Sequence, residues 1–210
     1  MKALTKTPFR RASAPAQWKQ TRKHGIILQN KKMGIDVFHY SIVDDKNRFL
    51  YDTIGISEPI GGCLIVIVDQ NGALGLIKEY RPIPDKVFIS CVRGFNEGKL
   101  PPEELVKKEV YEETSIDTVS SVTELGLVYQ NTTYFINPLT VYLACVDVHN
   151  TKTDLGEHDS ARAEGISSIT FYAQDDIQSM IARNEIQCQM TLSALMLYFA
   201  RLTDLPTKMP

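Results

Sequence analysis

The chain has 210 residues, of which 43% are hydrophobic and 23% are charged, and its formal net charge is −2. These values fit one globular domain, alone or with a small additional piece. The chain holds no apolar run of about 18 residues, which argues against a membrane-spanning helix. No CxxC or Cys/His spacing typical of zinc sites is present, so the four cysteines predict buried, reduced thiols in a cytosolic protein.

Basic side chains gather at the start of the chain. Residues 1–35 carry nine Lys or Arg side chains and no acidic one, whereas the rest carries 14 basic and 25 acidic side chains. Such a start is typical of an organelle presequence or of a mobile arm that touches anions, and both interpretations stay open. The pattern of a secretory signal is missing, so we expect a cytoplasmic protein, with an organelle as the alternative. Beyond this arm, nothing indicates nucleic-acid binding.

The first third of the chain predicts short strands and one hairpin. Strands are expected over residues 25–29 and 35–43, and residues 44–62 are interpreted as a segment of turns. Two apolar stretches, 63–69 and 73–80, flank a Gln-Asn-Gly turn, and this pattern predicts a β-hairpin.

From residue 87 onward, the sequence predicts both strands and helices. They are, in chain order, a strand at 87–92, a helix at 102–115, strands at 124–129, 139–148 and 166–172, and helices at 175–184 and 191–201. One helix among strands and two helices at the end predict an α/β fold, in which helices cover a mixed sheet. We therefore expect an N-terminal arm and β extension over residues 1–60 and an α/β domain over 61–205.

The helix predicted at 102–115 places three glutamates on its inner face. At about 100° per residue, Glu109, Glu112 and Glu113 share an arc with Leu105 and Val106, the side that should face the protein. Like charges at this spacing repel one another, so something must compensate them.

On the outer face of the same helix, acidic and basic side chains are spaced so that they can pair. The pairs Glu103–Lys107 and Glu104–Lys108 stand four residues apart, which favours ion pairs, and the inner glutamates are left without a helix partner. Partly buried carboxylates without a partner are costly, and a hard divalent cation such as Mg²⁺ is the usual remedy. A solvated acidic edge is the alternative that helix geometry leaves open.

The segment around these glutamates resembles the Nudix hydrolases, whose box reads G-x5-E-x7-R-E-U-x-E-E-x-G-U, with U a bulky apolar residue. Gly94 opens the box, and residues 108–116, Lys-Glu-Val-Tyr-Glu-Glu-Thr-Ser-Ile, fill its end without gaps. Lys-Glu-Tyr-Arg-Pro at 78–82 and Glu-Gly-Ile at 164–166 further resemble the ADP-ribose or ADP-sugar pyrophosphatase branch. The resemblance implies a Nudix α/β/α sandwich with a mixed sheet, preceded by a short β extension.

Three positions depart from the box. Leu100 stands where the first glutamate is expected, Lys108 replaces the arginine and Ser115 replaces the last glycine. In the family, that glutamate and arginine help to hold the loop against the helix. Glu97, three residues before Leu100, is the candidate for a partial substitute for the glutamate. The departures keep two alternatives open: a Nudix fold that binds a nucleotide or a partner protein without efficient turnover, and an unrelated interaction protein with a coincidental box.

The resemblance implies metal-dependent hydrolysis of the diphosphate in a nucleoside diphosphate derivative, such as ADP-ribose or another NDP-sugar. Glu109, Glu112, Glu113 and the backbone carbonyl of Arg93 would hold Mg²⁺, with Mn²⁺ as the alternative.

Catalytic roles follow from the same resemblance. Glu112 and Glu113 belong to the catalytic set, and Glu113 or a carboxylate of the loop at 151–165 would take a proton from the attacking water. Glu164 is the first candidate in that loop and Glu157 the second. For Glu164, a simple role in capping a strand is the alternative.

The expected partners are a small molecule and a second copy of the chain. Arg81 and Arg93 are the candidates for binding the substrate phosphates, with an ordinary surface arginine as the alternative for Arg81. In the related branch, strands before the core build a dimer, so a homodimer is expected.

Overall fold

The computed structural model describes residues 20–30, 35–44, 46–57, 61–96, 99–148, 154–155 and 158–202. The chain separates into two compact units, Met1–Ser57 and Glu58–Pro210. The basic N-terminal arm, Glu97 and Glu157 lie outside the described residues, so the expectations placed on them stay predictions. Within the described part of the chain, no helix is both long and apolar enough to cross a membrane.

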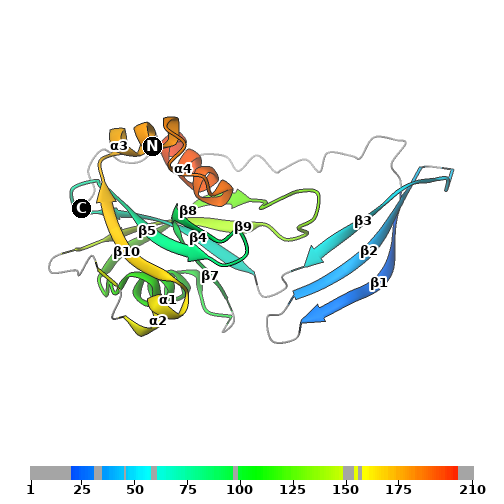
Figure 1. Ribbon diagram of the computed structural model, residues 1–210, viewed down its shortest axis with the longest axis horizontal. Helices are drawn as coiled ribbons and strands as arrows, with labels where there is room; N and C mark the ends of the chain where they lie inside the picture. Colours follow the sequence, from blue (N-terminus) through cyan, green and yellow to red (C-terminus); the bar gives the residue numbers. More distant parts are fainter. Residues whose placement is uncertain are drawn as a thin grey trace, which may run out of the picture. The chain divides into compact units, whose positions relative to one another are not determined.

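The first unit holds a three-stranded antiparallel sheet in the order β1 (Gln20–Asn30), β2 (Ile35–Val43) and β3 (Phe49–Ser57) (Figure 1). The predicted bounds of β2 are confirmed, whereas the interpretation of residues 44–62 as turns is wrong. A turn lies at the start of this segment, where Asp44 Oδ1 accepts hydrogen bonds from the backbone N–H groups of Lys46 (2.9 Å) and Arg48 (2.8 Å), and strand β3 follows it. The aromatic and β-branched residues that follow suit a strand.

The second unit is built on a mixed sheet with the order β10-β5-β4-β9-β8, in which β6 pairs with β5 and β7 pairs with β4. The strands are β4 (Gly62–Asp69), β5 (Leu74–Arg81), β6 (Lys86–Ser90), β7 (Val92–Phe95), β8 (Val119–Val128), β9 (Leu139–Val146) and β10 (Ile166–Tyr172). The central pair, β4 and β9, is parallel, and every other pair in this sheet is antiparallel. The mixed sheet expected from the sequence is thus confirmed.

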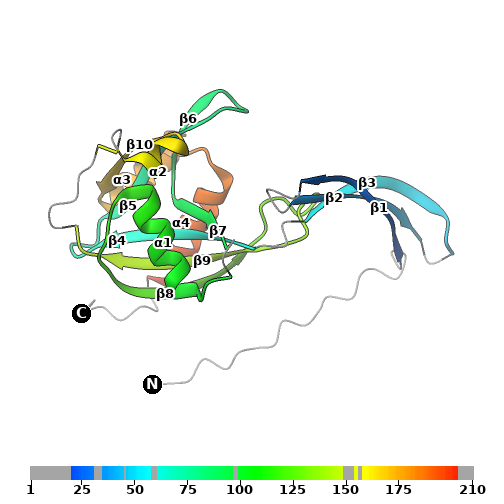
Figure 2. The same ribbon diagram turned by 90° about the horizontal axis from the view of Figure 1, so that it is seen from below.

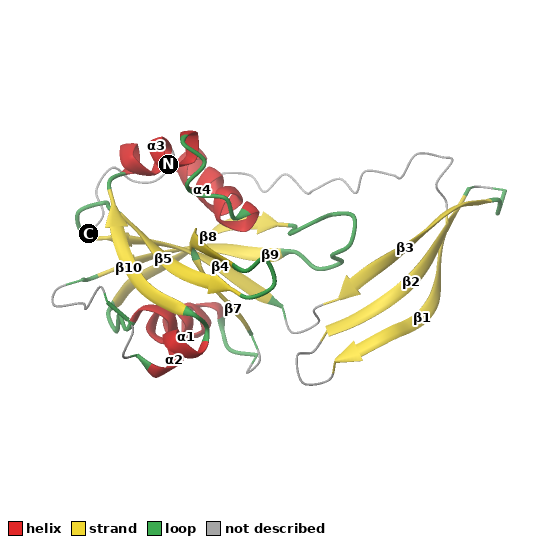
Figure 3. Cartoon of the chain, viewed as in Figure 1, coloured by secondary structure: helices red, strands yellow, loops and turns green. Residues whose placement is uncertain are grey.

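Helices cover both faces of this sheet. They are α1 (Pro102–Thr114), α2 (Asp159–Ala163), α3 (Gln174–Ala182) and α4 (Gln189–Arg201), with α1 and α2 on one face and α3 and α4 on the other (Figures 1 and 3). The short helix α2 falls inside the predicted loop at 151–165 and was missed because it has only five residues.

Successive side chains of strand β4 point to opposite faces of the sheet and contribute to both cores. Cys63, Ile65 and Ile67 pack into the core beneath α1, while the intervening apolar side chains pack into the core beneath α3 and α4. A strand buried on both faces explains the continuous apolar run from Cys63 to Val68. The three layers give the α/β/α sandwich that the resemblance implied, and the fold class is confirmed.

The predicted strand at 87–92 is divided in two, and the division positions the site. The break falls at Cys91, whose backbone N–H donates to the hydroxyl of Thr191 in α4 (3.1 Å) instead of to a neighbouring strand. The chain thereby passes from β6, beside β5, to β7, beside β4. This crossing brings Gly94 in β7 opposite helix α1.

Helix α1 ends in a left-handed residue. Ser115 adopts φ 60° and ψ 13°, and its N–H donates to the carbonyl of Tyr111 (2.8 Å). The exit expected for a glycine is therefore kept, although a side chain disfavours this conformation.

We expect Ser115→Gly to stabilise the protein by about 0.5–1 kcal/mol, because glycine adopts a positive φ at little steric cost. In a chain of this size, that gain raises the melting temperature by about 2–4 °C, which thermal denaturation would measure. Ser115→Ala is the matched control, since it removes the hydroxyl and keeps the strain. Equal melting temperatures for the two variants would contradict the account.

Candidate active site

The connection from β7 to α1 is fixed by Asn96. Its Oδ1 accepts from the backbone N–H of Leu100 (2.7 Å), and its Nδ2 donates to the carbonyl of the same residue (3.0 Å). The side chain of Leu100 packs against the core beneath α1. Leu100 and Asn96 thus secure a connection for which a glutamate was expected. Sequence reasoning missed Asn96, because its partners are backbone groups.

The side chain of Glu109 occupies the space that a Cβ would need at Gly94, so any other residue there would displace this carboxylate. A Cβ on Gly94 would lie 2.0 Å from both Cδ and Oε2 of Glu109. Pro102 begins the helix, and Leu105 and Val110 are buried in the core, which fixes the rotation of α1 and holds Glu109 against the strand. The close approach explains why the glycine and the glutamate occur together.

The glutamates of α1 lie at three depths. Glu113 is 1% exposed and Glu109 is 4% exposed, while Glu112 reaches the surface of the pocket described below. The inner arc predicted from helix geometry is confirmed for the first two.

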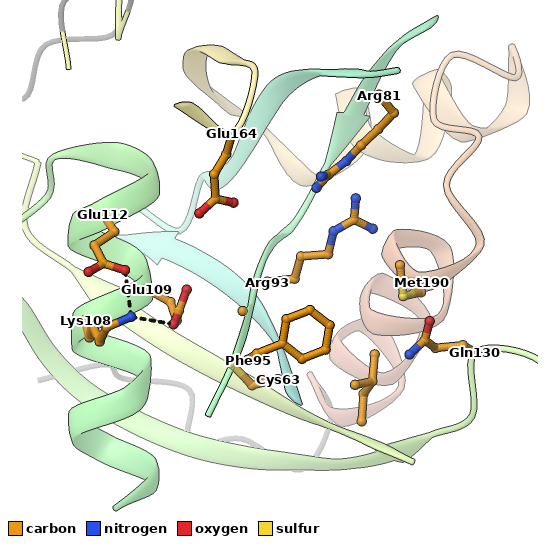
Figure 4. A pocket seen from close by; sticks show the side chains of 12 residues that line it. Cys63, Arg81, Arg93, Phe95, Lys108, Glu109, Glu112, Gln130, Glu164 and Met190 are labelled. Carbon is orange, nitrogen blue, oxygen red and sulfur yellow. Dashed lines mark hydrogen bonds and ion pairs between the residues drawn. The ribbon is translucent and has the colours of Figure 1, made fainter. Parts of the chain in front are cut away.

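The side chain of Lys108 does not extend over the solvated face, as the helix projection predicted, but toward the inner glutamates. Its Nζ lies 2.7 Å from Glu112 Oε2 and 3.1 Å from Glu109 Oε1, so its one positive charge is shared by two of the glutamates that were expected to lack a helix partner (Figure 4). The predicted pairing of Lys108 with Glu104 is replaced by this arrangement, whereas the pair of Lys107 and Glu103 is present at 2.7 Å. The side chain of Lys108 is long enough to turn around the helix, which a projection of backbone angles does not show.

Glu113 is the least compensated carboxylate of the cluster. Its Oε2 accepts a long hydrogen bond from the backbone N–H of Arg93 (3.4 Å), and Oε1 is buried without a hydrogen-bond partner among the described residues. Burial, followed by the charges of Glu164, Glu109 and Glu79, raises the pKa of Glu113 to about 9. Burial is also the main cause that raises the pKa of Glu109.

Two arginines share a buried carboxylate beside this cluster. Glu79 of β5 is 1% exposed, its Oε1 lies 3.0 Å from Arg93 Nη2, and its Oε2 forms an ion pair with Arg81. One carboxylate between two guanidinium groups leaves one positive charge for an anion and holds both groups in place. Glu79 was not predicted as a site residue, although its place two residues before Arg81, on the same face of the predicted strand, was a usable signal.

These groups line a pocket of about 650 Å³. Figure 4 shows Lys108, Glu109 and Glu112 on one side, and Phe95, Gln130 and Met190 on the other. Arg81, Arg93 and Glu164 complete the wall, as do Cys63, Gly94 and Leu139. The structure therefore brings together the predicted residues Arg81, Arg93, Glu109, Glu112 and Glu164, with Glu113 buried behind Arg93.

The charges of the site favour a cation. Five carboxylates (Glu79, Glu109, Glu112, Glu113 and Glu164) face three cationic side chains (Arg81, Arg93 and Lys108). The excess is two negative charges when all are ionised, and one while Glu113, with its raised pKa, holds its proton. The oxygen-rich donor set and the unsatisfied Oε1 of Glu113 fit a hard divalent cation. Within the described residues, however, no group of three or more His, Cys, Asp or Glu side chains is already arranged as a metal site.

No protein-family model matches the sequence, and no curated protein matches it. Among solved structures, the chain is similar to one described as "Crystal structure of ADP compounds hydrolase", with a TM-score of 0.66 and 13% sequence identity. The match covers 89% of this chain and 96% of that chain. At this identity the likeness shows a shared fold.

The burial of Glu113 predicts a pH-dependent stability. Its pKa rises from an ordinary 4.5 to about 9, so between these values the folded chain holds a proton that the unfolded chain releases. The free energy of unfolding should therefore fall as the pH rises from about 5 to 9. Glu113→Gln should remove this fall and, at pH 8 without divalent cations, stabilise the protein by more than about 1.4 kcal/mol.

Urea denaturation at pH 5 and pH 8 in the presence of a chelator measures this difference. Glu104→Gln, on the exposed side of the same helix, is the matched control and should behave as the unaltered protein. Parallel pH dependence in the Glu113→Gln and unaltered proteins would contradict the assigned burial cost.

The contacts of Lys108 predict how the site binds cations. Lys108→Met should raise the affinity for Mn²⁺ by about tenfold, because the ion no longer competes with an ammonium group for Glu109 and Glu112. The concentration of free Mn²⁺ in electron paramagnetic resonance titrations gives the affinity. Lys107→Met, which breaks only the exposed pair with Glu103, is the control and should leave the affinity unchanged. An unchanged or lower affinity in Lys108→Met would refute the competition.

Proposed function

We propose that the protein hydrolyses the diphosphate bond of a nucleoside diphosphate derivative, such as ADP-ribose or another NDP-sugar, with the help of Mg²⁺ or Mn²⁺. The observation that carries this proposal is that two oppositely charged groups line one pocket. The glutamates of α1 supply negative charge, and Arg81 and Arg93 supply positive charge across from them. A diphosphate and a divalent cation together complement both groups. The fold shared with an ADP compounds hydrolase supports the same class of reaction.

The cation would be held by Glu109, Glu112, Glu113 and the backbone carbonyl of Arg93. When bound, such an ion neutralises phosphoryl oxygens and lowers the pKa of a water molecule. Mg²⁺ favours a few carboxylates together with water and phosphate, which is the donor set that this pocket can supply.

The chain's own side chains bind the substrate and receive the proton. The guanidinium groups of Arg81 and Arg93 donate hydrogen bonds to phosphate oxygens, and Glu79 holds both groups in position. Glu164 lines the pocket between α1 and the arginine pair and accepts the proton of the attacking water. Glu113 is the second candidate for this role, and Glu157 stays a prediction from the sequence.

A homodimer is part of the proposal. Strand β3 exposes Phe49, Leu50 and Tyr51, which are 61%, 43% and 43% exposed. A three-stranded sheet with apolar side chains on its surface buries them efficiently against a second copy of itself.

One observation favours a second function, a Nudix-type fold that binds nucleotides without efficient turnover. Lys108 places one positive charge between Glu109 and Glu112, where a metal ion would be expected, and the described residues hold no ready metal site. In this alternative, the arginines still bind a diphosphate and the cation contributes little.

Activity assays separate the two functions. The protein should release a nucleoside monophosphate from ADP-ribose, or from another member of a panel of nucleoside diphosphate compounds, in the presence of Mg²⁺ or Mn²⁺. Glu112→Gln and Glu113→Gln should each lower kcat/KM by about 10²–10⁴-fold. Glu103→Gln, on the exposed side of the helix, should leave kcat/KM unchanged. Nucleotide binding without turnover on any compound would refute the hydrolase and favour the binding function.

A further inference from the structure

A second pocket places one cysteine beside the arginine pair. This pocket, of about 520 Å³, lies against the hairpin that joins β5 to β6, and Figure 2 shows that hairpin extending from the body of the second unit. Cys188 lines the pocket together with Arg81, Arg93 and Glu79. The Cys188 side chain is partly exposed, so its thiol is open to small molecules that enter the pocket.

The sulfur of Cys188 faces a cation. Arg93 Nη1 donates to Cys188 Sγ (3.9 Å), while Nη2 of the same guanidinium group contacts Glu79. Burial raises the pKa of the Cys188 thiol, but the hydroxyl and backbone N–H of Thr191, followed by the charge of Arg93, lower the pKa further, to below its ordinary value. A larger share of Cys188 is therefore thiolate, which is the form that reacts with oxidants.

A second cysteine, Cys91, lies close to the same threonine. Its backbone N–H donates to the hydroxyl of Thr191 (3.1 Å), and this hydroxyl interacts with the thiols of both Cys91 and Cys188. Cys91 is 1% exposed, and burial raises the pKa of its thiol to about 12. The pair thus combines one reactive sulfur at the pocket with one protected sulfur in the core.

Neither cysteine belongs to a helix or a strand. Cys91 lies in the break between β6 and β7, and Cys188 directly precedes α4. The backbone at these two positions is therefore not held in a regular element, and small shifts can bring the two sulfur atoms to the bonding distance of about 2 Å.

We propose that Cys188 and Cys91 form a redox-active pair, in which a hydroperoxide oxidises Cys188 and Cys91 then closes a disulfide. The Cys188 thiolate attacks the peroxide, the O–O bond breaks, and a sulfenic acid and an alkoxide or hydroxide are formed. The Cys91 sulfur then attacks the sulfenic sulfur, and its proton leaves with the hydroxyl group as water. The two thiols lose two electrons, and these reduce the peroxide.

The disulfide changes what Arg93 can bind. In the reduced protein, the guanidinium group of Arg93 faces both the Cys188 sulfur and Glu79. A disulfide sulfur carries no charge, so oxidation leaves Nη1 available for a phosphate oxygen. We expect the oxidised protein to bind inorganic pyrophosphate about two- to fivefold more tightly, the effect of releasing one partly exposed ion pair. This consequence rests on the proposed role of Arg93 in binding the diphosphate, whereas the disulfide itself does not.

Thiol counting in the full chain tests the pair. After treatment with hydrogen peroxide and unfolding, the number of free thiols should fall from four to two, and dithiothreitol should restore it. Peptide mass spectrometry should find Cys91 linked to Cys188. An unchanged count, or oxidation without this linkage, would overturn the proposal.

Three variants assign the roles of the cysteines. Cys188→Ser should keep its three thiols under the same treatment, and Cys91→Ser should stop at a sulfenic acid on Cys188, which dimedone traps. Cys145→Ser removes the other partly exposed cysteine and is the matched control, so it should still lose two thiols. Loss of two thiols in Cys188→Ser would contradict the assignment.

Calorimetric titration with inorganic pyrophosphate, in the presence of a chelator, tests the consequence for Arg93. The oxidised protein should bind more tightly than the reduced protein. Cys188→Ser should bind as tightly as the oxidised protein, with or without peroxide. Equal affinities of the reduced and oxidised proteins would overturn the coupling to Arg93. Neither thiol counting nor this titration measures turnover, so failure of the proposed hydrolysis would leave both readouts intact.

Discussion

The contact between Glu109 and Gly94 is the constraint from which the site follows. A side chain at position 94 would collide with the carboxylate, so the glycine permits Glu109 to keep its place beside β7. The same packing buries Glu113 behind the strand and directs Glu112 toward the pocket. Carboxylates held together in this way repel one another, and the structure relieves part of that repulsion through Lys108. Because the carboxylates still repel one another, a bound cation would stabilise the site by removing the remaining repulsion.

The sheet and its helices could be predicted because their signals are local. The hairpin of β4 and β5 follows from an Asn-Gly turn between apolar runs, and the α/β/α layering follows from strands interrupted by helices. Strand β3 and helix α2 escaped prediction for different reasons. Turn residues at its start obscured β3, and a helix of five residues is too short to display a period. The break at Cys91 depends on a hydrogen bond to Thr191, which is 100 residues away in the sequence.

The positions of site residues that share one helix face could be predicted from the sequence. Contacts that depend on where a long side chain reaches could not. Glu109 and Glu113 lie where the helical period places them. Lys108 reaches around the helix to two glutamates, and Asn96 takes over the securing of the loop through backbone groups. The role of Glu79 depends on arginines from two strands, a relation that is visible only after folding. Leu100 and Lys108 stand where the resemblance led us to expect a glutamate and an arginine, and the carboxylates of α1 nevertheless lie together.

The central claim is that the crowded carboxylates of α1 are a cation site from which Lys108 must withdraw. A crystal structure of the protein grown with Mn²⁺, with anomalous diffraction recorded at the manganese edge, tests it most directly. The account predicts an anomalous peak bounded by Glu109, Glu113 and the carbonyl of Arg93, with the ammonium group of Lys108 displaced from Glu109. A map without a peak at this position, in which Lys108 still bridges Glu109 and Glu112 at saturating Mn²⁺, would contradict it.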